Sequence, residues 1–175
     1  MQLATPRLLL RPLHGHATKG LRPRTNFLRI GAGELSWIGS FERGHKCGCC
    51  TVQMMPDRKH MFVMAGGAGY ILDAKSRALV EEIGTEVVGV IENRPRTLFV
   101  VNHDDTILEA FGKSGRLWKT ASIGSGGIRE MAFADDAIVG EARHPSRPGW
   151  VEFSVSLATG EVRLLCRSRV AHFDG

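Results

Sequence analysis

The sequence predicts an all-β protein made of short strands joined by tight turns. Short runs of β-branched and aromatic residues recur from residue 35 onward. Turn-forming residues separate these runs, and 21 of the 175 residues are glycine, against an average share of about 7%. Sustained helical periodicity is almost absent. A hydrophobic content of 43% argues against a disordered chain, and no apolar run is long enough to span a membrane.

The expected strands fall into three successive groups of four. The groups are residues 51–54, 61–65, 69–73 and 76–83; residues 87–91, 98–101, 106–111 and 116–120; and residues 128–133, 137–142, 151–157 and 162–166. Residues 76–83 also suit a short helix. An isolated helix of about eight residues is marginal, so we expect a strand there. The strict alternation of residues 151–157 predicts a half-buried strand.

The same strand–turn–strand pattern occurs three times, in residues 70–80, 108–118 and 155–165. Aligning Lys75 with Lys113 gives a step of 38 residues, and aligning Lys113 with Ala158 gives a step of 45. Both steps fit the roughly 40–45 residues of a four-stranded propeller blade.

At these hairpins the chain resembles β-propeller repeats of the quinoprotein-like type. Those repeats close each blade with a phrase such as Leu-Asp-x-x-Thr-Gly-x-x-x-Trp, which residues 110–118 and 157–161 partly reproduce. The resemblance implies about three tandem four-stranded antiparallel units. Because a closed propeller usually takes 4–8 blades, we expect these units to be open or completed by an oligomer.

A second resemblance is to a family of small uncharacterised bacterial all-β proteins with a Trp-x-Ser-x-Arg-x-x-x-Asp-Gly-Ile segment. Trp118, Thr120 and the pair Gly127-Ile128 match that segment, but Ser122 and Gly126 stand where it has Arg and Asp. This resemblance implies no known activity.

The positive charge is concentrated at the N-terminal end of the sequence. Residues 1–33 contain six Lys and Arg and no acidic residue, whereas residues 34–175 contain 17 Lys and Arg against 18 Asp and Glu. We therefore expect a basic, weakly ordered arm over residues 1–33 and a single all-β domain over residues 34–175. The arm is interpreted as a leader, with phosphate or lipid binding and mitochondrial targeting as alternatives. Without a secretory signal, we expect a cytoplasmic protein.

A cluster of metal-ligand residue types follows the first expected turn. His45, Cys47, Cys49 and Cys50 lie within six residues and offer the imidazole and thiolate ligands that zinc and copper accept. A second segment, such as His60 or Cys166, could complete a site. The spacing differs from standard zinc motifs, and the alternative is a turn with small buried cysteines. Cysteines this close cannot form an efficient disulfide framework, which indicates a reducing compartment.

Other candidate residues have simpler interpretations as turn or core residues. The glycine-rich residues 66–69 and 124–127 suit tight turns better than phosphate loops. Residues 103–105 (His-Asp-Asp) and 135–136 (Asp-Asp) are expected in turns with their side chains in water, and His144 is expected in a loop. Trp118 is expected to face the core.

These features indicate a non-catalytic binding or interaction module. The expected partner is a protein, or a second copy of the chain joined through β edges. No catalytic or cofactor-binding residue is predicted, and nucleic-acid binding is expected only through the basic arm. The alternative is a metal- or ligand-dependent enzyme centred on His45, Cys47, Cys49 and Cys50.

Overall fold

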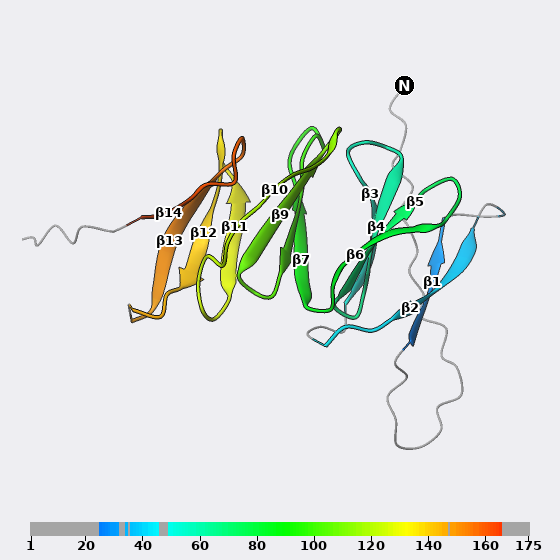
Figure 1. Cartoon of the computed structure of the whole chain (residues 1–175), viewed down its shortest axis with the longest axis horizontal. Coiled ribbons are helices and arrows are strands. Elements are labelled where there is room, and N and C mark those ends of the chain that lie inside the picture. Colours follow the sequence, from blue (N-terminus) through cyan, green and yellow to red (C-terminus); the bar gives the residue numbers. More distant parts are fainter. Residues whose placement is uncertain (1–24, 32–33, 35, 46–48, 147, 166–175) are drawn as a thin grey trace, which may run out of the picture. The chain divides into compact units, whose positions relative to one another are not determined.

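The computed structural model describes residues 25–31, 34, 36–45, 49–146 and 148–165 (Figure 1). These residues form strands and turns, so the all-β prediction is confirmed. Three tandem four-stranded antiparallel sheets occur where the three groups of strands were predicted. The chain divides into two compact units between Val88 and Gly89, which we describe separately. In the described ranges, no helix has the length and apolar character needed to cross a membrane.

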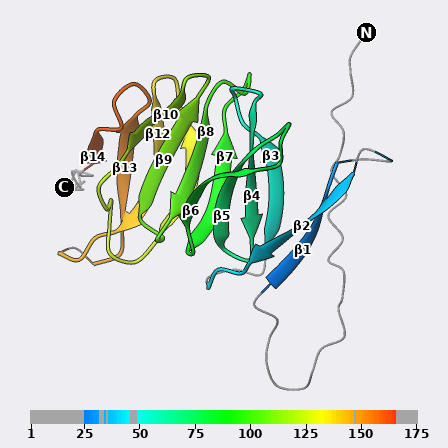
Figure 2. The same ribbon diagram turned by 45° about the vertical axis from the view of Figure 1, so that its right-hand side comes forward.

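The first unit contains a two-stranded ribbon and one four-stranded sheet. The ribbon pairs β1 (Thr25–Ile30) with β2 (Trp37–Glu42). The sheet has the order β3-β4-β5-β6. Its strands are β3 (Cys50–Met54), β4 (His60–Ala65), β5 (Ala68–Asp73) and β6 (Leu79–Gly84). In both views the ribbon lies beside this sheet (Figures 1 and 2).

Strand β1 falls within the segment that charge alone predicted to be a weakly ordered arm. Leu28 and Ile30 alternate inward along β1 and are buried. The expected arm boundary at residue 33 therefore does not separate β1 from the folded unit, because its apolar alternation supplies core residues. Residues 1–24 lie outside the described residues, and the prediction for them stays a prediction.

The core of the first unit lies between the ribbon and the sheet. Its buried members are apolar side chains from β1, β2, β4 and β5: Leu28, Ile30, Phe41, Met61, Val63, Ala65 and Leu72. The hairpin between β4 and β5 turns at Gly66 and Gly67, whose φ angles are 59° and 96°. The tight-turn interpretation of this glycine run is confirmed.

The second unit contains two sheets of four strands, with the orders β10-β9-β8-β7 and β11-β12-β13-β14. The strands of the first are β7 (Val87–Glu92), which begins before the boundary, β8 (Phe99–His103), β9 (Ile107–Gly112) and β10 (Gly115–Lys119). Those of the second are β11 (Ile128–Phe133), β12 (Ala137–Arg143), β13 (Trp150–Ser156) and β14 (Val162–Leu165). The three predicted strand–turn–strand phrases are the hairpins β5–β6, β9–β10 and β13–β14.

Trp118 on β10 is a central residue of the second unit's core. Its side chain is 8% exposed, and its indole Nε1 donates a hydrogen bond to the carbonyl oxygen of Leu157, 2.8 Å away. Gly160, with a φ of 73°, lies so close that an added Cβ would be 2.8 Å from Trp118 Cδ2. The third sheet's last hairpin therefore covers this ring, and the prediction that Trp118 faces inward is confirmed.

Candidate functional site

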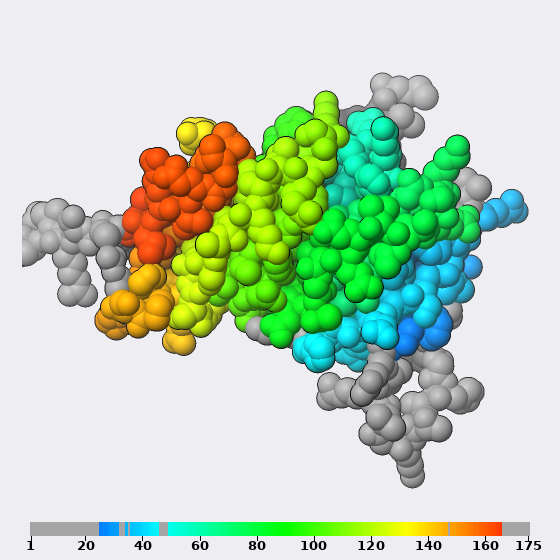
Figure 3. All heavy atoms as spheres, in the orientation of Figure 1, coloured from blue at the N-terminus to red at the C-terminus, as the bar shows by residue number. Residues whose placement is uncertain are grey.

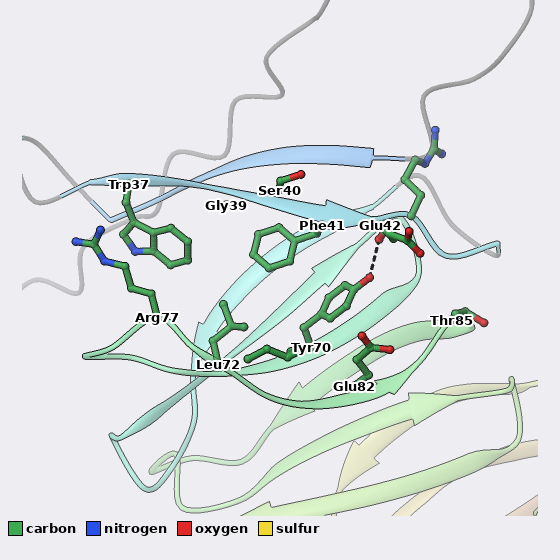
Figure 4. A pocket seen from close by; sticks show the side chains of 12 residues that line it. Trp37, Gly39, Ser40, Phe41, Glu42, Tyr70, Leu72, Arg77, Glu82 and Thr85 are labelled. Carbon is green, nitrogen blue, oxygen red and sulfur yellow. Dashed lines mark hydrogen bonds between the residues drawn. The ribbon is translucent and has the colours of Figure 1, made fainter.

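The first unit contains an open pocket of about 400 Å³, which we call the β2 pocket (Figure 4). It lies between strand β2 on one side and strands β5 and β6 with their connecting turn on the other. The lining residues are Trp37, Gly39, Ser40, Phe41, Glu42, Arg43, Tyr70, Leu72, Arg77, Leu79, Glu82 and Thr85. No residue of β1 belongs to this set. In Figure 3 the ribbon atoms are drawn in blue and cyan.

Strand β2 supplies the aromatic wall of the pocket. Successive side chains of a strand alternate between its faces, so Trp37, Gly39 and Phe41 share one face. A Cβ at Gly39 would lie 2.6 Å from Phe41 Cζ and 2.9 Å from Trp37 Cζ3. The two rings can therefore approach each other only because residue 39 carries no side chain.

Tyr70 closes one end of the pocket. Its hydroxyl donates a hydrogen bond to the carbonyl oxygen of Glu42, 3.0 Å away, and its ring centre lies 5.4 Å from that of Phe41. Partial burial, followed by the negative charges of Glu82 and Glu42, raises the pKa of the phenol above 10.0. The Tyr70 hydroxyl is therefore a neutral hydrogen-bond donor at physiological pH.

Arg77 supplies a cation at the other end of the pocket. Its guanidinium carbon lies 5.4 Å from the centre of the Trp37 ring, a distance at which a cation is attracted by the ring face. Within the described chain, no carboxylate lies within ion-pair distance of Arg77. Asp73 shapes the turn, because its Oδ1 accepts hydrogen bonds from the Ser76 and Lys75 amides at 2.6 and 3.1 Å. These bonds lower the pKa of Asp73 below 3.8, the Ser76 amide contributing most.

The predicted metal residues are only partly described. His45 is exposed, and its backbone amide donates to the Thr85 carbonyl oxygen at 3.0 Å. Cys49 is disulfide-bonded, which the sequence analysis did not expect, whereas Cys50 is a half-buried free thiol. Cys47 lies outside the described residues. A sulfur in a disulfide is not a thiolate ligand, but the zinc or copper site itself is untested and stays a prediction.

The residues considered for completing a metal site do not converge in the described chain. His60 is engaged by Asp57, whose Oδ2 lies 2.6 Å from its Nδ1, and Cys166 lies outside the described residues. No cluster of three His, Cys, Asp or Glu residues suited to a metal occurs in the ranges that the structure covers.

The second unit contains a buried charged cluster that sequence reasoning missed. Glu109 on β9 is 2% exposed and accepts a hydrogen bond from the Arg116 Nε. Its Oε2 lies 3.2 Å from His103 Nε2 and 3.9 Å from Lys119 Nζ. The His103 contact falls outside hydrogen-bond geometry, so we treat it as electrostatic. Burial raises the pKa of Glu109, but His103, Arg116 and Lys119 outweigh it and hold this pKa below 4.5.

Among the expected turn residues, His103 requires a correction. It ends strand β8 with its ring buried (3% exposed), because every residue of that strand is buried. Asp104 is exposed in the following turn, and Asp135 and Asp136 are exposed between β11 and β12, as predicted. His144 lies in the loop after β12, where its Nδ1 accepts the Ser146 amide at 3.3 Å.

The comparisons with known proteins found similar solved structures at low sequence identity. No family model and no curated protein matches the sequence. Similar solved structures include the β-propeller domain of Swd1 from Myceliophteria thermophila, at 11% identity and a TM-score of 0.46. They also include hydrazine synthase from Kuenenia stuttgartiensis, at 10% and 0.46, and Hsv2p from Kluyveromyces lactis, at 15% and 0.40.

The shared part of these structures covers 81%, 81% and 82% of this chain. It covers 54%, 46% and 50% of the respective matched chains, so this chain spans about half of their length. One of these matched structures, that of Swd1, is a β-propeller domain. The resemblance to small bacterial proteins is not tested by these comparisons and stays a prediction.

Proposed function

We propose that this protein is a non-catalytic interaction module, and that the β2 pocket binds a segment of a protein partner. The observation that carries this proposal is a set of partly exposed apolar and aromatic side chains, Leu79, Trp37 and Tyr70, beside a cation, Arg77, that has no carboxylate partner among the described residues. Leu79 lines the pocket and remains 54% exposed. Covering a half-exposed leucine contributes about 1 kcal/mol, which a partner would gain and the isolated unit does not.

The chemical groups of the pocket suit recognition of a polypeptide. Trp37 and Tyr70 are partly exposed, with the buried Phe41 ring beside them, and aromatic residues dominate binding energy at protein interfaces. Arg77 and Glu82 offer opposite charges, and the Ser40 hydroxyl and backbone offer hydrogen bonds. These groups support binding through contact, charge and hydrogen bonds.

Selection of binders from a phage-displayed peptide library on the purified full chain tests this proposal. We expect enriched peptides whose affinity falls about tenfold or more in Trp37→Ala, since loss of an aromatic anchor commonly costs over 1 kcal/mol. Phe27→Ala is the matched control, because Phe27 is an exposed aromatic (45%) of the same ribbon outside the pocket.

Equal loss of affinity in both variants, or no loss in Trp37→Ala, would exclude the β2 pocket as the binding site. Circular dichroism of both variants establishes that they are folded. The expectations of a cytoplasmic location and of no membrane partner remain part of this proposal and are untested.

A further inference from the structure

We infer that the partner segment binds as an added β-strand along the free edge of β2, antiparallel to it, with a basic residue near Glu82 and an acidic residue near Arg77. This inference rests on the proposed function and specifies how the β2 pocket would be filled. Its occupant is an extended segment of another protein.

The first argument is the difference in strand number between the two layers of the first unit. The ribbon has two strands, whereas the sheet that it packs against has four. The β2 pocket is lined by β2, β5, β6 and the β5–β6 turn, with no contribution from β1. In Figure 4 the Trp37 and Phe41 side chains point from β2 toward Tyr70 and Leu72, whereas the Ser40 side chain points away from them. The pocket thus lies between β2 and the β5–β6 hairpin, where no described strand pairs with the free edge of β2.

The second argument concerns the backbone of β2. In an antiparallel ladder, the backbone groups of alternate residues point toward the paired strand and the others point away. The Glu42 carbonyl accepts the Tyr70 hydroxyl, so it points away from β1. By the same alternation, the N–H and C=O groups of Ile38 and Ser40 also point away from β1. Within the described chain, β2 pairs with no strand other than β1.

The third argument is the uncovered surface of β6. Leu79 pairs across the sheet with Leu72, which is buried on the ribbon side. Leu79 therefore lies beside a position that the ribbon covers, yet it is 54% exposed, and the neighbouring Val80 is 53% exposed. A strand added to β2 would extend the ribbon over this part of β6.

Within the described residues, the edge of β2 has no lysine, proline or bulge to discourage strand pairing. Edge strands are commonly blunted by lysine, by proline or by a bulge. Strand β2 reads Trp-Ile-Gly-Ser-Phe-Glu and pairs with β1 in regular register. It carries one charge, at Glu42, its last residue. The edge is therefore receptive to another strand.

The charges at the two ends of the pocket set the charge pattern expected of an antiparallel partner strand. Arg77 lies over Trp37, the first residue of β2, and has no acidic partner within the described residues. Glu82 pairs across the sheet with Tyr70, whose hydroxyl contacts Glu42, the last residue of β2. Arg43 also lines the pocket. An antiparallel strand would then place a basic residue at its own N-terminal end and an acidic residue at its C-terminal end.

Two synthetic heptapeptides of identical composition test this inference. One begins with lysine, alternates valine and threonine, and ends with glutamate; the other exchanges the two charged residues. We expect the first to bind the full chain about tenfold more tightly, since two favourable exposed ion pairs are replaced by two repulsive pairs. In Arg77→Glu this preference should shrink or reverse.

Amide hydrogen exchange reads out the pairing directly. Binding of the first peptide, or of the tightest library peptide, should slow exchange at the amides of Ile38 and Ser40. The amides of Gly39 and Phe41 face β1 and serve as internal controls. Ser40→Pro removes the free N–H and should weaken binding about tenfold relative to Ser40→Ala, which keeps it.

The possible outcomes separate this inference from the proposed function. Binding that depends on Trp37 but leaves exchange at Ile38 and Ser40 unchanged would overturn strand addition and leave the pocket as a binding site. Independence of Trp37 for every selected peptide would overturn both. Concentration-dependent protection of these amides without peptide would make the occupant a second copy of the chain. If Ser40→Pro does not fold, the exchange pattern of the unsubstituted chain decides.

Discussion

Strands β10 and β6 are both the last strand of a four-stranded sheet, but their surroundings differ. On β10, Trp118 faces a second four-stranded sheet. The β13–β14 hairpin covers its ring, and the side chain is 8% exposed. On β6, Leu79 faces the two-stranded ribbon and is 54% exposed. The number of strands in the facing layer therefore decides whether a large apolar side chain belongs to the core or to a pocket.

The largest effect on stability is expected from truncating the covered side chain, Trp118. Trp118→Ala should lower the free energy of unfolding by about 3–5 kcal/mol, because it opens a cavity and leaves the Leu157 carbonyl without its indole donor. Urea denaturation followed by circular dichroism measures this change. A loss below about 1 kcal/mol would mean that the β13–β14 hairpin contributes little cover.

The next effect concerns the buried carboxylate of the second unit. Glu109→Gln should lower the free energy of unfolding at pH 7 by about 1–3 kcal/mol, a range reduced because its partner Arg116 is half exposed. The pKa of Glu109 is lowered in the folded state. Its contribution to stability is therefore fully present above the unfolded pKa and is lost as the pH falls through the folded pKa.

Because the pKa of Glu109 is lowered in the folded state, the unsubstituted protein and Glu109→Gln should differ in their sensitivity to acid. Between pH 7 and pH values below the ordinary glutamate pKa of 4.5, the unsubstituted protein should lose more stability than Glu109→Gln. Thermal melts across this range measure the difference. Parallel curves for the two proteins would show that Glu109 has no lowered pKa in the folded chain.

A smaller effect is expected in the wall of the β2 pocket. Gly39→Ala places a Cβ against the rings of Trp37 and Phe41 and should lower the free energy of unfolding by about 1–2 kcal/mol, while reducing the pocket. Ser40→Ala, the neighbouring change, serves as the control. Unchanged stability and unchanged peptide binding in Gly39→Ala would show that the rings move apart freely.

The smallest effect on stability is expected from truncating the exposed side chain, Leu79. Leu79→Ala should change the free energy of unfolding by less than about 0.5 kcal/mol, because most of its side chain already contacts water. The same urea denaturation used for Trp118→Ala gives a direct comparison. A loss above about 2 kcal/mol would mean that Leu79 is buried in solution.

The sequence predicted the three four-stranded sheets because each strand carries its own apolar run and each turn its own glycine or polar signal. It placed Trp118 inside for the same local reason. It did not predict β1 as part of the folded unit, because the interpretation of residues 1–33 relied on charge, whereas Leu28 and Ile30 carry the packing information. Charge composition describes a segment as a whole, and burial depends on alternate residues.

Local sequence patterns could not predict the β2 pocket or the Glu109 cluster. Trp37 and Arg77 are far apart in the sequence, and nothing in either neighbourhood indicates that one would lie over the other. Glu109 sits in an apolar run as a single charge, which could equally face water. No alternation in β9 marks Glu109, because residues 108–112 are all buried. Its partners His103, Arg116 and Lys119 lie on adjacent strands or at their ends.

The hydrogen bond from Trp118 to Leu157 spans 39 residues of sequence, and this separation has a consequence for biosynthesis. During translation, the indole ring leaves the ribosome well before the segment that covers it. At about 5–20 residues per second, the delay is about 2–8 s. Throughout that interval the nascent chain presents an uncovered tryptophan on the last strand of a completed four-stranded sheet. Chaperone capture is therefore expected to be most frequent on nascent chains in which Trp118 has left the ribosome and Leu157 has not.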